Sequence, residues 1–181
     1  MIRGTRTIDP RRLLLAILVI SLAVLAAAFA GQYLFGLDPC VLCLYQRVPW
    51  AAAALISALA LVGWAGRHSL LPIGLCAVIF AAGGALAFYH VGVEQHWWGS
   101  VAGCAGEAAT NLTLDDLRPE ALATGLRPCD RVDWRLFGLS FAGYNVIASA
   151  LLSVGCLAGL ALIGRKPAHD RNNAAHRPSA G

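Results

Sequence analysis

The chain has 181 residues, of which 58% are hydrophobic and only 13% are charged, and its mean hydropathy is +0.64. Soluble domains carry charge on about a quarter of their residues, so this composition excludes an ordinary water-exposed globular domain. Intrinsic disorder is excluded as well, because disordered chains combine low hydrophobicity with high net charge. The net charge of +4 is modest, and its meaning depends on where the basic residues fall.

Four long apolar runs organise the chain. Each lacks Asp, Glu, Lys and Arg, and they cover residues 13–35, 48–66, 70–89 and 136–164. A helix needs about 20 apolar residues to cross the hydrocarbon core of a bilayer. Helix is the default there because every backbone N–H and C=O must be bonded within the segment. The sequence therefore predicts an all-α membrane protein, a four-helix transmembrane bundle with loops at about 36–46 and 90–135.

The charges outside these runs predict the orientation. The leader (residues 1–12), the link between the second and third runs, and the tail (165–181) together hold nine basic and two acidic residues. The other two loops hold five basic and eight acidic residues. Because positively charged segments stay in the cytoplasm, we expect both termini to be cytoplasmic and both loops to face outward. The basic charge thus reports topology, and no nucleic-acid partner is expected.

Four of the six cysteines fall in the two outward loops. Cys40 and Cys43 form a Cys-x-x-Cys motif in the first loop, and Cys104 and Cys129 are separated by 24 residues in the second. Outside the cytoplasm, disulfides are favoured over free thiols. The two pairs have three interpretations: structural disulfides in a non-enzymatic membrane scaffold, a four-cysteine metal site, or a redox-active centre that exchanges disulfides.

The Cys-x-x-Cys spacing favours the redox interpretation. A disulfide across so short a loop removes little entropy from the unfolded chain. A zinc site usually has a second closely spaced pair, which the second loop lacks. The motif leads directly into the second apolar run, so we expect Cys43 near a helix N-terminus, whose partial positive charge stabilises a thiolate. Arg47, four residues further on, would lie on the same helix face. Cys76 and Cys156 lie within apolar runs and are expected to act as small apolar side chains.

The run Cys40-Val-Leu-Cys43-Leu-Tyr-Gln-Arg47 closely resembles the bacterial disulfide bond formation protein B family, DsbB. The resemblance covers about residues 13–164 and extends to four spans, cytoplasmic termini and a cysteine pair in each periplasmic loop. It implies a multi-pass protein of the bacterial inner membrane. The activity it implies is that of a quinone-dependent oxidoreductase, which reoxidises a periplasmic dithiol oxidase of the DsbA type and passes the electrons to the membrane quinone pool.

The resemblance also implies a role for each loop cysteine. Cys104 and Cys129 would form the disulfide presented to the DsbA-type partner, whose thiolate would attack at Cys104. Electrons would then pass by disulfide exchange to Cys40 and Cys43. Cys43 would carry the thiolate that contacts the quinone.

Two further site residues follow from the same resemblance. Arg47 would polarise the quinone and stabilise the thiolate. His90, at the end of the third apolar run, would contact the quinone in the same pocket. The cofactor is either ubiquinone or menaquinone, and no metal is expected.

Overall fold

The computed structural model describes residues 9–64, 70–99, 129–132 and 134–164. Within these residues, four helical segments are long and apolar enough to cross a membrane. Three are single helices: α1 (Pro10–Leu34), α4 (Leu70–Glu94) and α6 (Phe141–Gly164). The remaining one consists of α2 (Val41–Tyr45), α3 (Arg47–Leu59) and the π-helical turn η1 (Ala60–Trp64). The prediction of a four-helix transmembrane bundle is confirmed.

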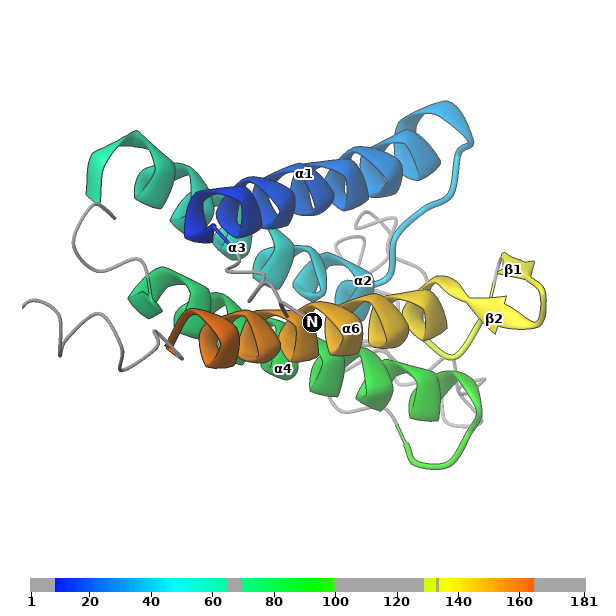
Figure 1. The fold of residues 1–181 in the computed structure, drawn as a ribbon. Coiled ribbons are helices and arrows are strands. Elements are labelled where there is room, and N and C mark those ends of the chain that lie inside the picture. Colours follow the sequence, from blue (N-terminus) through cyan, green and yellow to red (C-terminus); the bar gives the residue numbers. More distant parts are fainter. Residues whose placement is uncertain (1–8, 65–69, 100–128, 133, 165–181) are drawn as a thin grey trace, which may run out of the picture.

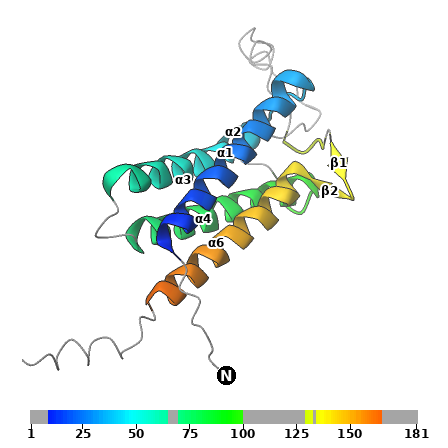
Figure 2. The same ribbon diagram turned by 45° about the horizontal axis from the view of Figure 1, so that its top comes forward.

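The four segments alternate in direction along the bundle (Figure 1). The beginning of α1 and the end of α6 lie at one end, whereas α2 and the strands β1 (Arg135–Leu136) and β2 (Leu139–Ser140) lie at the other (Figure 2). The alternation therefore gathers the Cys-x-x-Cys motif and the chain entering α6 at the same end. Which side of the membrane this end faces stays a prediction from the charges.

The starts of α1 and α6 are set by local capping. The Asp9 carboxylate accepts the Arg11 N–H at 3.0 Å, and Pro10 occupies the first helical position, where a missing N–H costs nothing. At α6, the Ser140 hydroxyl accepts the Gly143 N–H at 3.2 Å. Both caps satisfy backbone donors that have no partner within the helix.

The core of the bundle receives side chains from all four spanning segments. Its centre contains Trp50 and Phe80, whose rings lie 5.2 Å apart, and it also buries Cys76 and Cys156, as expected for small apolar side chains. Helices α3 and α4 approach closely at Gly83, where a Cβ would lie 2.9 Å from the Cβ of Pro49. A side chain at this position would force the two helices apart.

Three predicted span boundaries are wrong. The second spanning segment begins at Val41, inside the predicted loop at about 36–46, rather than at residue 48. The third apolar run was expected to end at residue 89, but α4 continues to Glu94, so His90 lies inside the helix rather than at its end. The helix continues because residues 91–93 are apolar or small and the Glu94 carboxylate is buried against a side-chain partner. The second loop accordingly begins after Glu94.

The fourth span begins at Phe141, not at residue 136. Residues 135–140 form a two-stranded antiparallel hairpin in which Leu136 pairs with Leu139. Its two-residue loop, Phe137 and Gly138, has positive φ at both positions (49° and 81°), the backbone of a tight hairpin turn. The apolar side chains of this hairpin make its sequence indistinguishable from the start of a span by composition.

Candidate redox site

The Cys-x-x-Cys motif forms its own short helix. Cys40 is the N-cap of α2, where its Sγ accepts the backbone N–H of Cys43 at 3.2 Å. Cys43 thus lies in the first turn of a helix, as expected, but the helix is α2 and not the long helix that follows. The Cys40 thiol also donates to Cys43 Sγ, and the two sulfurs lie 2.8 Å apart. The pair is placed for making and breaking one disulfide.

The two sulfurs of the motif differ in their surroundings. Cys40 is 5% exposed, whereas Cys43 is partly exposed at the cavity wall. The hydrogen bond to Cys43 and burial raise the pKa of the Cys40 thiol. Cys40 therefore keeps its proton and acts as the donor of the pair, leaving Cys43 as the acceptor.

Cys129 brings the second loop to the same place. It is 1% exposed and packs in one cluster with Cys40, Leu42 and Val93. Its backbone interacts with the side chain of His90. A cysteine 86 positions after Cys43 is thus adjacent to the first pair, which sequence spacing alone does not reveal. Its predicted partner Cys104 lies outside the described residues.

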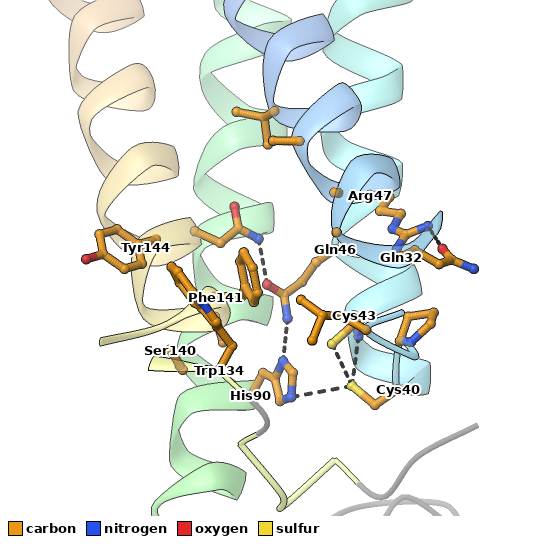
Figure 3. Close-up of a pocket in the computed structure, with 18 of the residues that line it drawn as sticks. Gln32, Cys40, Cys43, Gln46, Arg47, His90, Trp134, Ser140, Phe141 and Tyr144 are labelled. Carbon is orange, nitrogen blue, oxygen red and sulfur yellow. Dashed lines mark hydrogen bonds between the residues drawn. The ribbon is translucent and has the colours of Figure 1, made fainter. Parts of the chain in front are cut away.

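His90 lies between Gln46 and Cys40 (Figure 3). It is 3% exposed, and its Nε2 lies 3.6 Å from Cys40 Sγ. Its other ring nitrogen, Nδ1, lies 2.6 Å from Nε2 of Gln46. The carboxylate of Glu94, one helical turn further along α4, lies 3.8 Å from His90 Nε2. His90 thus lies directly beside the sulfur of Cys40.

A second set of polar side chains continues inward from Gln46. Its Oε1 accepts a hydrogen bond from Nδ2 of Asn145 at 2.6 Å. The Oδ1 of Asn145 in turn accepts from the indole N–H of Trp50 at 2.9 Å. Together with the contact between Gln46 and His90, these contacts join α3, α4 and α6 through side-chain hydrogen bonds.

Arg47 lines the same cavity as Cys43. Its Nη1 donates to Oε1 of Gln32 on α1 at 2.8 Å, and its guanidinium carbon lies 4.8 Å above the centre of the Phe29 ring. The planar guanidinium suits both contacts, one as a donor fork and the other by stacking over a π-face. The two contacts hold a permanent positive charge at the cavity wall (Figure 3).

A cavity of about 300 Å³ opens beside these residues, at the lower end of the range for small-molecule sites. Its walls include the stacked rings of Trp134 and Phe141, whose centres lie 4.4 Å apart. Tyr144 also lines it and is held by a hydrogen bond from its hydroxyl to the Leu136 carbonyl at 2.9 Å. Flat aromatic walls with a few donors at one side suit a planar carbonyl compound such as a quinone.

Several residues of the site were not predicted from the sequence. Glu94 is 8% exposed and accepts a hydrogen bond from the Ser140 hydroxyl, yet it was assigned to a loop. Gln32 and Asn145 are polar residues within apolar runs. Polar side chains within membrane spans are costly and commonly functional, so this signal could have singled them out.

The cysteine and histidine side chains of the site also form a possible donor set for a metal. Ligand atoms of Cys40, Cys43 and His90 lie within 4.8 Å of one another. Sulfur and imidazole donors in this number are acceptable to zinc. Zinc analysis of the purified protein therefore distinguishes a metal site from a redox pair.

The sequence was compared with a family model and with individual known proteins. The sequence matches the family model described as "Disulfide bond formation protein DsbB" over residues 10–159. Disulfide bond formation protein B of Marinobacter nauticus is 32% identical over 148 residues, covering 76% of this chain and 84% of the relative. The proteins of the same name from Xylella fastidiosa (30% over 152 residues, 79% and 86%) and a Polaromonas species (27% over 159 residues, 86% and 92%) are also similar. No solved structure matches significantly.

Proposed function

The chain belongs to the DsbB family of disulfide bond formation proteins, and from that premise we propose that it reoxidises a periplasmic dithiol oxidase of the DsbA type and delivers the electrons to a membrane quinone. It is a multi-pass membrane protein. We further propose that it resides in the bacterial inner membrane with both termini in the cytoplasm. The charge distribution and the alternating helices support this topology.

The observation that carries the proposal is the clustering of three cysteines, two of which line one cavity. Cys40 and Cys43 lie 2.8 Å apart, Cys129 packs against Cys40, and Cys43 lines the cavity. Disulfide exchange requires an attacking thiolate, a leaving sulfur and access. This arrangement supports exchange between the loops at Cys40 and electron release at Cys43.

The proposed exchange balances in two steps. The partner's two thiols become a disulfide as the Cys104–Cys129 disulfide is reduced, and exchange then reduces a Cys40–Cys43 disulfide while restoring the second-loop disulfide. Reoxidation of the Cys40 and Cys43 thiols releases two electrons and two protons. A bound quinone supplies a two-electron, two-proton acceptor.

The residues at the cavity would each perform one task. Arg47, held by Gln32 and Phe29, would place a positive charge beside the quinone. This positive charge would stabilise the negative charge that develops on the quinone as it accepts electrons in a weakly polar site. His90 faces Cys40 and supplies a hydrogen-bonding ring nitrogen beside the sulfur. Trp134 and Phe141, which stack on each other at the cavity wall, would provide a flat apolar surface for the quinone ring.

Reconstitution tests the proposal. The purified full chain, a reduced DsbA-type protein and a short-tailed ubiquinone or menaquinone should give one quinone reduced for each partner disulfide formed under anaerobic conditions. Cys104→Ala should stop partner oxidation, and Cys156→Ala should serve as a matched control because this cysteine lies in the core. No quinone-dependent oxidation would leave the scaffold interpretation. Stoichiometric zinc with activity that depends on it would favour the metal interpretation.

A further inference from the structure

One continuous series of hydrogen-bonded side chains links the core of the bundle to the sulfurs of the motif, and Figure 3 shows its outer part from Gln46 to Cys43. It runs through Trp50, Asn145, Gln46, His90, Cys40 and Cys43. Four of its members are nearly inaccessible: Trp50 is 2%, Gln46 7%, His90 3% and Cys40 5% exposed. A buried chain of this kind is favourable only if each donor meets an acceptor, so the direction of its hydrogen bonds is constrained.

Trp50 fixes that direction at the inner end. An indole N–H can only donate, so the atom of Asn145 that lies 2.9 Å from it must be the amide oxygen. The Ser149 hydroxyl lies 3.2 Å from the same oxygen and also donates to it. The opposite amide orientation would place N–H groups against each other in a buried site, which costs more than the loss of an ordinary hydrogen bond.

The remaining bonds follow from this orientation. With its oxygen facing Trp50, Asn145 turns its NH₂ group to Gln46 Oε1 at 2.6 Å. Gln46 therefore turns its own NH₂ group to Nδ1 of His90 at 2.6 Å. Because Nδ1 accepts this bond, the proton of the neutral imidazole lies on Nε2.

The protonated Nε2 faces the sulfur. It lies 3.6 Å from Cys40 Sγ and 3.8 Å from Glu94 Oε1. Cys40 passes the same direction on by donating to Cys43 Sγ. Every donor from Trp50 outward thus points toward Cys43, which is the acceptor at the end of the chain.

We propose that Trp50, Asn145 and Gln46 are positioning residues that hold His90 in the Nε2–H tautomer, so that His90 donates to Cys40 and the chain of donors ends on the sulfur of Cys43. The inference rests on the proposed function, because the direction of the hydrogen bonds matters for activity only if Cys40 and Cys43 exchange disulfides. A donor on Cys40 stabilises negative charge when this sulfur leaves during exchange. It also leaves the sulfur of Cys43 as a hydrogen-bond acceptor, and a thiolate can only accept hydrogen bonds.

The tautomer can be read directly without quinone or partner protein. In the full chain, labelled with ¹⁵N-histidine and placed in lipid nanodiscs, the resonances of His90 are identified by their loss in His90→Gln. We expect a non-protonated Nδ1 and a protonated Nε2. A protonated Nδ1 in the wild-type protein overturns the proposal, whatever the oxidase activity. A correct tautomer in a protein without oxidase activity leaves this inference standing and removes the proposed function.

Gln46→Glu tests the direction with almost no change of shape. A carboxylate has two acceptor oxygens, so it can accept from Asn145 but cannot donate to His90. We expect the proton to move to Nδ1, which reverses the ¹⁵N pattern of the ring. An unchanged pattern in this variant contradicts the proposal.

Trp50→Phe tests the origin of the direction. Phenylalanine keeps an aromatic ring against Phe80 but removes the indole donor. We expect the two tautomers of His90 to mix and partner oxidation to slow about fivefold, the effect of one ordinary hydrogen bond. The same substitution at Trp97, which is 59% exposed and makes none of these hydrogen bonds, should change neither readout. If Trp50→Phe retains a pure Nε2–H signal, Trp50 does not set the tautomer.

Discussion

Two groups of cysteines in this protein are similarly buried but differ in the side chains that surround their sulfurs. Cys76 and Cys156 are 0% and 1% exposed within the central apolar core, while Cys40 and Cys129 are 5% and 1% exposed at the end of the bundle. Burial therefore does not separate structural sulfurs from those proposed to be reactive. The neighbours do: the central pair lies in the apolar core, where Cys76 contacts a serine hydroxyl and a backbone carbonyl. In contrast, Cys40 contacts an imidazole and a second thiol and lies in a cluster with Cys129.

The comparison teaches where reactivity comes from in a membrane protein. Thiol chemistry needs a thiolate, and a thiolate needs hydrogen-bond donors or positive charge when water is excluded. At the end of the bundle α2 supplies a backbone donor, His90 a ring nitrogen and Arg47 a nearby cation. The same residue type placed deeper in the bundle contributes packing.

The largest expected effect breaks the comparison directly. Cys40→Ala should lower quinone-dependent partner oxidation by at least about a thousandfold, because a member of the exchanging pair is lost. Cys76→Ala should retain activity and lower the free energy of unfolding by about 1 kcal/mol through a small cavity. Steady-state oxidation and thermal unfolding of both proteins provide the measurement. Comparable activity in the two variants would make the two groups equivalent and the account wrong.

Arg47 sharpens the comparison on the acceptor side. Arg47→Ala should raise the quinone concentration needed for half-maximal rate by about tenfold, the effect of losing one charge-assisted contact. Disulfide exchange between the two cysteine pairs should stay largely intact, because the arginine lies at the cavity wall. Quinone titration and quenched-flow trapping of mixed disulfides separate the two effects.

Two controls accompany the Arg47 titration. Arg47→Lys keeps the charge but not the planar contact with Phe29, and should fall between wild type and Arg47→Ala. Arg12→Ala, whose side chain is 88% exposed, should leave the quinone dependence unchanged. A quinone dependence that is the same in Arg47→Ala as in wild type removes Arg47 from the site.

The two sulfurs of the motif should also differ in alkylation of the reduced protein. Because the pKa of Cys40 is raised, its thiol stays protonated at neutral pH, and only the thiolate reacts. Its alkylation should be slow and should accelerate about tenfold for each pH unit between about pH 7 and 9, without a plateau. Peptide mapping by mass spectrometry should find Cys43 modified first. Modification of Cys40 ahead of Cys43 would reverse the proposed roles.

The smallest effect concerns packing alone. Gly83→Ala places a Cβ 2.9 Å from that of Pro49 and should destabilise the bundle by about 1–3 kcal/mol. Gly155→Ala meets nothing within 4 Å and should be nearly neutral. Neither should change the quinone dependence of the remaining active protein. Equal unfolding temperatures for the two variants would contradict the close approach of α3 and α4.

Composition and spacing predict the parts of this protein that depend on local sequence. Four spans follow from uninterrupted apolar runs, and the Cys-x-x-Cys motif with Arg47 identifies one end of the bundle. The hairpin at 135–140 was missed because Leu136, Phe137 and Leu139 read as the start of a span, and its turn depends on positive φ at Phe137. Local composition does not report that backbone conformation.

The rest of the site depends on tertiary structure. Gln46 and Asn145 are 99 positions apart, and only the packing of α6 beside α3 and α4 joins them. Glu94 reads as a loop residue because the third apolar run is taken to end at residue 89, yet its hydrogen bond with Ser140 places it inside the protein. Partners of this kind satisfy a buried polar group at long sequence distance and leave no periodic signal.

The measurement that tests the central claim most directly is a visible absorption spectrum of the purified protein with quinone. If the sulfur of Cys43 meets the quinone in the cavity beside Arg47, a thiolate–quinone charge-transfer band should be present in the wild-type protein and in Cys76→Ala, and absent in Cys43→Ser. A band that persists in Cys43→Ser, or no band in any of the three proteins, would contradict the account.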